Sequence, residues 1–335
     1  MDRTFARHRR TVLRAVPALA ALPFVQARAA PARRARLVLA GPMASVSNPL
    51  VRIVESGALA DLADQVDFVL WSNPDQLRAL AMQGQADFIA VPTNVGANLY
   101  NRGVPLALLN VSVWGLLWMV SRRADARTLA DFKGQEIAVP FRADMPDILF
   151  QLLAAKQGLD PQRDFRLRYV ASPIDAMQLL VLRQVDHALL SEPAVSMALH
   201  KSHGPLMPEL HRSVSLQDEW GRLLQRAPQI PQAGIAALGA ARQDAALCAR
   251  LQAAYATAQD WCNRNAEACG AMVAKRIPMM NAQAVADGVQ AAPKRLATAA
   301  EARPDLEFFY RLLLERQPAL VGGKLPDAAF YAGSH

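Results

Sequence analysis

The 335-residue sequence is poor in the residues that usually form catalytic and metal sites. It contains three cysteines and six histidines, and the histidines are scattered along the chain. One of them, His187, lies within an apolar run, where a buried structural role is the simpler interpretation. The sequence also lacks G-x-S-x-G, P-loop, G-x-G-x-x-G and H-E-x-x-H motifs, which position nucleophiles, phosphates, dinucleotides and zinc. We therefore expect no catalytic centre, bound metal or cofactor.

The few cysteines leave one structural alternative open. Cys262 and Cys269 are seven residues apart, which on one unbroken helix is about 10.5 Å along the axis. A disulfide needs Cα atoms within roughly 7 Å. If Asn265 begins a second helix, the chain folds back and the two cysteines can pair, which an oxidising compartment would favour. Cys248 is better interpreted as a small buried apolar residue.

The excess of positive charge does not indicate a nucleic-acid-binding face. The formal net charge is +8, but residues 1–29 hold six arginines and one aspartate, a net +5 that leaves +3 for the rest. Arg33, Arg34 and Arg36 follow directly. Because no further basic face remains, nucleic acid is not an expected partner.

The first residues resemble an export signal. The stretch "RHRRTVLRAVPALAALPFVQARA" has a basic head, a short apolar run and an A-x-A cleavage site ending at Ala29. The run from Ala15 to Val25 is too short for a membrane span, which needs about 20 apolar residues, and no later run is long enough. Arg9 and Arg10 resemble a twin-arginine signal, with an ordinary Sec signal as the alternative. We expect a cleaved signal peptide, residues 1–29, and a periplasmic protein.

One pattern occurs twice in the chain. The stretch "SNPDQLRALAMQGQADFIAVPT", residues 72–93, returns 99 residues later as "ASPIDAMQLLVLRQVDHALLSE". Both copies have the order loop, helix, turn, strand, loop. The identical pairs are Pro74 with Pro173, Leu80 with Leu179, Gln85 with Gln184 and Asp87 with Asp186.

The repeat extends beyond these two stretches. "RLVLAGPMASVSNPLVRIV" from Arg36 corresponds to "EIAVPFRADMPDILFQLLA" from Glu136, and "VDFVLW" corresponds to "FRLRYV". Each half thus predicts the order β-α-β-α-β-α. Alternating strands and helices are typical of a parallel sheet covered on both faces.

The chain length and the repeat together predict two lobes. Trp114 and Gly115 lie between two apolar runs and suit a hinge, and Pro228–Gly239 suits a returning segment. The sequence from Ala240 onward has a helical pattern and is expected to pack on the first lobe. We predict that residues 36–115 and 236–335 form lobe I and residues 116–235 form lobe II.

Open parallel sheets bind ligands beyond the carboxyl ends of their strands. In the first half these positions are 41–47, 71–73 and 92–94, and in the second half they are 141–145, 172 and 191–192. Two lobes that face each other would line a cleft with these loops. The sequence therefore predicts a ligand site between them.

The most distinctive of these loops is the one in "AVPFRADMPDILF", which runs from Phe141 to Met145 and is followed by a helix. A helix N-terminus with Arg142 beside it suits an anion. The alternative is that Asp144 caps the helix and Arg142 points to solvent. Phe141 suits either stacking on a ligand or packing in the hinge.

Other loop residues have two interpretations. Thr93 and Asn94 suit helix capping or hydrogen bonding to a ligand. Glu192 suits either a solvated helix start or a carboxylate that accepts from a ligand N–H. Trp71 and Trp114 suit either the core or a ligand platform.

Four segments resemble one known family: "GQADFIAVPTN", "TLADFKGQEIAVPF", "RQVDHALLSEPAVSMAL" and "LVGGKLPDAAFY". The family is the periplasmic substrate-binding proteins of ABC importers, in the nitrate, sulfonate and taurine group that includes binders of thiamine pyrimidine precursors. The resemblance implies an α/β, type II periplasmic binding protein fold, with two doubly wound lobes joined by a two-segment hinge. The family's ligand-contacting loops match here Ser45, Thr93, Asn94, Phe141, Arg142 and Glu192.

The resemblance implies a monomeric protein that closes on a small organic ligand, anionic and sulfonate-like or aromatic, and delivers it to a permease and ATPase at the inner membrane. Relatives often have small polar residues where this chain has Phe141 to Met145. Pyrimidine-synthesising enzymes with the same fold use lysine and histidine residues that these loops lack. The alternatives are a periplasmic sensor or partner protein of the same fold, or such an enzyme.

Overall fold

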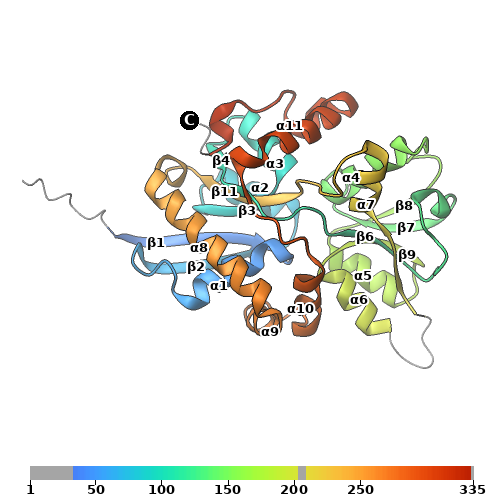
Figure 1. Cartoon of the computed structure of the whole chain (residues 1–335), viewed down its shortest axis with the longest axis horizontal. Helices are drawn as coiled ribbons and strands as arrows, with labels where there is room; N and C mark the ends of the chain where they lie inside the picture. The colour runs from blue at the N-terminus through green and yellow to red at the C-terminus, as the bar shows by residue number, and fades with distance from the viewer. Residues whose placement is uncertain (1–32, 203–208, 333–335) are drawn as a thin grey trace, which may run out of the picture. The chain divides into compact units, whose positions relative to one another are not determined.

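The computed structural model describes residues 33–202 and 209–332 (Figure 1). The predicted signal peptide, residues 1–29, lies outside these ranges. Within the described ranges no helix is long and apolar enough to cross a membrane.

The first lobe is built on a five-stranded sheet with the order β2-β1-β3-β11-β4. Strand β1 pairs in parallel with β2 and β3, whereas β11 runs antiparallel to both β3 and β4. The strands are β1 (Arg34–Pro42), β2 (Ala63–Trp71), β3 (Phe88–Pro92), β4 (Leu106–Leu108) and β11 (Ala233–Leu238).

The second lobe repeats this plan, with the order β10-β6-β9-β7-β8. Strand β7 is parallel to β8 and β9, and β6 is antiparallel to β9 and β10. The strands are β6 (Leu117–Ser121), β7 (Glu136–Pro140), β8 (Arg166–Val170), β9 (His187–Ser191) and β10 (His211–Ser215).

The prediction of parallel sheets was therefore wrong in part, because both sheets are mixed. The three strands of each β-α-β-α-β-α unit are parallel, as predicted. In each sheet one strand runs opposite to these three, β11 in the first lobe and β6 in the second. Each of these two strands follows a crossing between the lobes, so the chain enters the sheet from the hinge side. Strands β4 and β10 are antiparallel to β11 and β6 and therefore run in the same direction as the three parallel strands.

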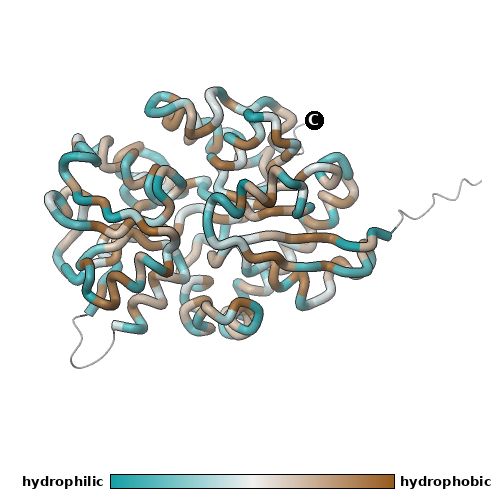
Figure 2. The backbone as a smooth tube through the Cα atoms, turned by 180° about the vertical axis from the view of Figure 1, so that it is seen from behind, coloured by the Kyte–Doolittle hydropathy of each residue, from teal (hydrophilic) through white to brown (hydrophobic). Residues whose placement is uncertain are grey.

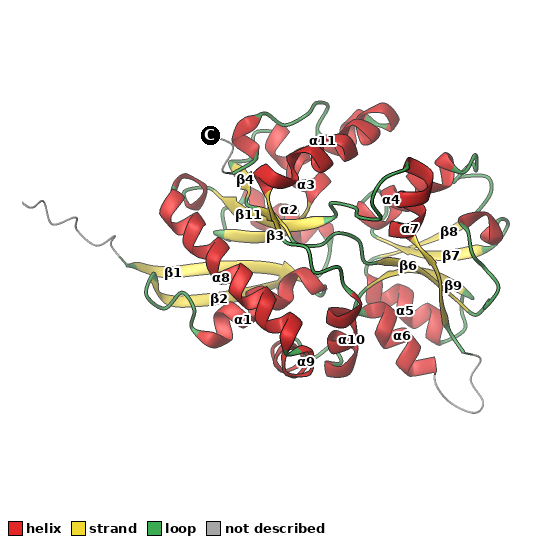
Figure 3. Ribbon diagram, in the orientation of Figure 1, coloured by secondary structure: helices red, strands yellow, loops and turns green. Residues whose placement is uncertain are grey.

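Helices cover both faces of each sheet (Figure 3). Alternate residues of β1 face opposite ways, so Leu37 and Leu39 belong to one apolar core and Val38 and Ala40 to another. In the first lobe the helices of these two cores are α1 (Asn48–Ser56), α8 (Ala245–Arg264) and α9 (Ala266–Arg276) on one face, and α2 (Pro74–Met82), α3 (Thr93–Asn101) and α11 (Ala299–Arg316) on the other.

The second lobe has the same layers. Figure 2 shows hydrophobic residues concentrated in the strands of both sheets. The covering helices are α4 (Met145–Lys156) and α7 (Leu216–Leu224) on one face, and α5 (Pro173–Val181) and α6 (Ala194–Ser202) on the other. Helix α10 (Ala282–Ala291) contacts both α9 and α6, so the C-terminal region also touches the second lobe.

Short elements complete the fold. The two-stranded sheet pairs β5 (Asn110–Val111) with β12 (Ala297–Thr298). The 3-10 helices are η1 (Ser45–Ser47), η2 (Leu129–Phe132), η3 (Ala241–Gln243), η4 (Pro318–Val321) and η5 (Ala328–Phe330).

Two chain segments join the lobes and are hydrogen-bonded to each other. Val113 forms a β-bridge with Ala233. The Ile230 N–H donates to the Trp114 carbonyl over 3.0 Å. Gly115 has a φ of +115°, which L side chains rarely adopt. The two-segment connection therefore lies where the sequence predicts it, while the predicted lobe limit at 235/236 falls inside β11 and stays a prediction.

The helical break at Asn265 brings the two distal cysteines together. Helix α8 ends at Arg264 and α9 begins at Ala266. Cys262 and Cys269 are both buried, free thiols. A hydrogen bond with Cys269, together with burial, raises the pKa of the Cys262 thiol. Their pairing as a disulfide stays a prediction.

Candidate functional site

Loops from both lobes surround one cavity of about 100 Å³. They follow the carboxyl ends of the parallel strands in each sheet, the position at which such sheets bind ligands. The walls are mostly apolar and include five prolines. The lining residues are Pro42, Met43, Ala44, Ser45, Val46, Trp71, Ser72, Pro74, Leu77, Ala90, Val91, Pro92, Val113, Leu116, Phe141, Asp144, Met145, Pro146, Pro173, Ile174, Ser191, Glu192, Gln232 and Ala233.

Trp71 gives the first lobe's wall a large ring and an unused donor. The side chain is buried at the end of β2. Its indole Nε1 is buried and has no hydrogen-bond partner among the described residues. Because a buried N–H without a partner is costly, this atom is suited to donate to a bound molecule.

The second lobe contributes a strained turn between β7 and α4. Phe141 and Ala143 both have a φ of +59°, which is unfavourable for residues with a side chain. The turn is held by the Asp144 N–H, which donates to the Phe141 carbonyl over 2.9 Å, and by the Ala143 N–H, which donates to Asp147 Oδ2 over 2.7 Å. These bonds fix Phe141 and Met145 at the cavity wall.

Asp144 links the two lobes. Its side chain is 5% exposed, and its Oδ2 atom lies 2.9 Å from Nη2 of Arg78, which comes from α2 of the first lobe. Its Oδ1 atom accepts from the Met145 N–H and caps α4. Burial raises the pKa of Asp144, and Arg78 acts in the opposite direction. Both oxygens are thus occupied by protein donors.

Glu192 is also paired within the protein. It is completely buried. Its Oε1 atom accepts from Nη2 of Arg212 over 2.7 Å, and its Oε2 atom accepts from the Ser196 hydroxyl over 2.8 Å. The interpretation of Glu192 as a solvated helix start is therefore wrong.

Comparison of the sequence with known protein families shows which family this chain belongs to. Residues 59–277 match the family described as "ABC transporter, phosphonate, periplasmic substrate-binding protein". The match covers well over half of the chain. The chain belongs to this family.

Solved structures of binding proteins share the fold. An ABC transporter protein from Parabacteroides distasonis is 21% identical, with a TM-score of 0.73 over 90% of this chain and 100% of that one. The aliphatic sulphonate binding protein SsuA of Escherichia coli is 16% identical, with a TM-score of 0.65 over 88% and 92%. The nitrate-binding protein NrtA of Synechocystis PCC 6803 is 15% identical, with a TM-score of 0.67 over 85% and 82%.

These similarities confirm the type II periplasmic binding protein fold and the role as the substrate-binding component of an ABC importer. The family consists of binding proteins and not of enzymes. No curated protein gives a significant match to the sequence. At these identities the solved structures show the fold alone, so the narrower nitrate, sulfonate and taurine group stays a prediction.

The structure of this binding protein brings six of the ten predicted ligand-site residues to the cavity. They come from the ends of β1, β2, β7 and β9 or the loops that follow. They are Ser45, Trp71, Phe141, Asp144, Met145 and Glu192.

The other four predicted residues lie elsewhere. Thr93 donates its hydroxyl to the Pro231 carbonyl over 2.6 Å, and Asn94 is buried beside it. Neither caps α3 with its side chain, because Pro92 occupies the N-cap position. Trp114 lines a neighbouring cavity and carries Arg295 over its ring. Arg142 is exposed, with its guanidinium 5.2 Å from the Tyr169 ring.

The sequence prediction missed Gln232 and the partner of Asp144. Gln232 lines the cavity from the second crossing, and its Oε1 atom accepts from the Leu116 N–H over 3.3 Å. Its place in "PQIPQAG" was a usable signal, because the returning segment must border the cleft. Arg78 gave no such signal, since it is a single arginine in the middle of a helix and not in one of the loops that follow the strands.

Proposed function

We propose that this protein captures a small organic molecule in the cavity between its lobes and presents the closed form to an ABC permease. The observation that carries the proposal is the cavity itself, which has walls from both sheets at the carboxyl ends of their parallel strands. The direct contacts proposed are Ser45, Trp71, Phe141 and Met145. Arg142 is not included, because it is exposed and does not line the cavity.

Closure is supported by contacts that join the two lobes. Arg78 of α2 binds Asp144, and Arg316 of α11 donates to the Gln151 side chain of α4 over 2.9 Å. Separation of the lobes would break these contacts and open the cavity. A ligand that touches both walls therefore favours the closed form by its difference in affinity for the two forms.

Asp144 and Glu192 are proposed to shape the site and not to act as free hydrogen-bond acceptors. The carboxyl oxygens of each are engaged by an arginine and by donors of the adjoining helix. Thr93 and Asn94 are proposed to hold the start of α3. We keep the predicted lobe limits and the monomeric state as part of the proposal.

Native mass spectrometry of the protein purified from the periplasm of its own host tests this function. The wild type should carry a small molecule that is released on unfolding. Ala44→Phe would fill the cavity, because Ala44 is a half-buried lining residue. Ala60→Phe adds the same ring at an exposed site and is the matched control.

The expected result is loss of the bound mass in Ala44→Phe and its retention in Ala60→Phe. The unfolding temperatures should agree with that of the wild type once the bound molecule has been removed from each protein, because a ligand stabilises the protein that carries it. Equal retention in both variants would show that the molecule binds elsewhere. A wild type that carries no molecule, and that no compound stabilises, would overturn the proposed capture.

A further inference from the structure

The charge on the cavity wall does not suit an oxyanion. Among the described residues, no lysine, arginine or histidine lines the cavity, and the two charged lining residues are Asp144 and Glu192. Arg78 and Arg212 lie outside the lining and are paired with these carboxylates. An anionic ligand would therefore lose its hydration on entering the cavity and find no cation at the wall to replace it. Such a transfer of an unpaired charge is strongly unfavourable.

The helix N-termini at the cavity offer little compensation. Helices α2 and α5 begin with Pro74 and Pro173, and α4 has Pro146 as its second residue, so each first turn lacks one backbone N–H that an anion would use. The side chains of Asn73, Asp144 and Ser172 already accept from other N–H groups of these first turns. An anion at these termini would therefore find fewer free donors than at an uncapped helix start.

Two further helix starts, those of α6 and of η1 with α1, differ in how far their N–H groups are already occupied. At α6, Oε2 of Glu192 accepts from the Ser196 N–H over 3.2 Å, which places a carboxylate where an anion would bind. The start of η1 and α1, beside Ser45, has no side-chain cap. A polar atom of a ligand fits there, but none of the described residues that line the cavity beside it is a lysine, arginine or histidine.

The remaining wall is suited to a small flat apolar molecule. Trp71, Phe141, Met145 and Ile174 line it, and the buried donor Trp71 Nε1 has no partner within residues 33–202 and 209–332. The cavity volume of about 100 Å³ is of the same order as the roughly 150 Å³ of an apolar cavity that holds benzene, so the ligand should be no larger than a molecule built on one small ring.

We propose that the cavity selects an uncharged, flat, mainly apolar molecule that accepts a hydrogen bond from Trp71 Nε1, and that it discriminates against phosphonates and sulfonates. This inference rests on the proposed function, because it concerns the same cavity. It separates this chain from the ligand named in the description of its family.

Matched neutral and anionic probes test the proposal by calorimetry on the purified protein. The pairs are benzenesulfonamide with benzenesulfonate and benzamide with benzoate, and methylphosphonate represents the family description. Each pair keeps the ring and changes the charge. The neutral member should bind at least tenfold more tightly in each pair, and methylphosphonate should not bind measurably.

Two tryptophan variants test the hydrogen bond. Trp71→Phe keeps a ring and removes the N–H, and should weaken binding of the neutral probe by roughly three- to tenfold. Trp118→Phe is the control, because Trp118 lies on β6 and does not line the cavity. Equal affinities of Trp71→Phe and the wild type would overturn the role of this donor.

The outcomes separate the two proposals. Tighter binding of benzenesulfonate, benzoate or methylphosphonate would overturn the neutral ligand class and leave capture by the cavity intact. If none of the four aromatic probes binds, the proposal of an aromatic ligand is overturned. A bound mass that is lost in Ala44→Phe would still support capture of a molecule by the cavity. Only the absence of any cavity ligand would overturn both.

Discussion

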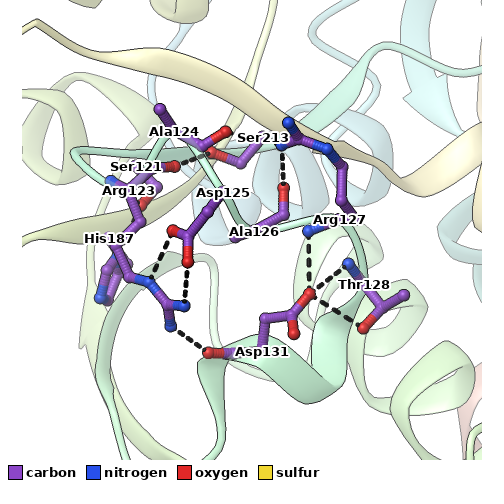
Figure 4. A network of polar contacts seen from close by, with 10 residues as sticks. All are labelled: Ser121, Arg123, Ala124, Asp125, Ala126, Arg127, Thr128, Asp131, His187 and Ser213. Atoms are coloured by element: carbon purple, nitrogen blue, oxygen red, sulfur yellow. Dashed lines mark hydrogen bonds and ion pairs between the residues drawn. The ribbon is translucent and has the colours of Figure 1, made fainter.

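His187 shows how burial fixes the role of a single titratable residue. It is 3% exposed, its Nδ1 lies 2.9 Å from the Ser121 hydroxyl, and its ring packs edge-on against Phe132. Figure 4 shows it beside Arg123, whose guanidinium binds Asp125 and the Asp131 carbonyl. Burial lowers the pKa of His187, with Arg123 acting in the same direction and Asp186 against it.

The lowered pKa predicts a pH dependence of stability. Because the unfolded chain binds the proton more readily, the stabilisation by neutral His187 is present above its ordinary pKa of about 6.5 and is lost as pH falls through the lowered value. Urea unfolding at pH 7.5 and pH 5 should show this loss. His187→Gln should be destabilised at pH 7.5 by lost packing, yet show a smaller further loss at pH 5. Parallel losses in both proteins would contradict the assignment.

Residue positions in the loops were predictable, but side-chain directions were not. The sequence placed Phe141 to Met145 at the end of a strand, and the structure confirms that position. The positive φ angles of Phe141 and Ala143 turn the chain so that Phe141 lines the cavity and Arg142 is exposed. The turn is held by a hydrogen bond from the Ala143 N–H to Asp147, which follows in the helix. A residue pattern predicts neither this bond nor the angles.

At the scale of elements, apolar periodicity predicted the strands and helices of both repeated halves. The break between α8 and α9 was also an expected alternative at Asn265. What periodicity does not predict is how closely two elements approach. Helices α9 and α10 meet at Gly270, where an added Cβ would lie 2.1 Å from the Ala282 carbonyl oxygen.

Gly270→Ala should therefore destabilise the protein. Overpacking of this kind costs about 1–3 kcal/mol and occasionally more, which exceeds the gain of about 1 kcal/mol from replacing a helical glycine. Denaturant midpoints at constant m-value would measure the difference. Gly96→Ala in α3 is the matched control, because its Cβ would meet its nearest neighbour at 3.5 Å. A midpoint for Gly270→Ala at or above that of Gly96→Ala would contradict the close contact.

At the scale of the whole molecule, the repeat predicted two lobes and a ligand site between their loops. The contacts between the lobes could not be predicted from the sequence, because the residues that form them are distant in sequence and share no motif. Arg78 and Asp144 are 66 residues apart, and nothing local connects a half-buried helical arginine with the cap of another helix. These contacts determine how stable the closed form is, so they matter for affinity.

The Arg78–Asp144 ion pair should stabilise closure more than folding. The Asp144 side chain is 5% exposed in this structure, whereas that of Arg78 is 39% exposed, so solvent reduces the strength of the pair. In an open form the Asp144 carboxylate could be hydrated. Arg78→Ala should therefore disfavour closure by about 0.5–1.5 kcal/mol and weaken ligand binding by roughly two- to tenfold.

Solution scattering without ligand and calorimetry with ligand would measure this effect, and a double-mutant cycle with Asp144→Asn would isolate the pair, because asparagine can still cap α4. Arg36→Ala is the control: its ion pair with Asp67 lies on the surface of the first lobe alone, so affinity should not change. For Arg78→Ala we expect a larger radius of gyration without ligand and a lower affinity for the ligand, while the free energy of unfolding in urea should be nearly unchanged. If unfolding stability instead falls as much as affinity, the pair supports the fold of one lobe and does not hold the two lobes closed.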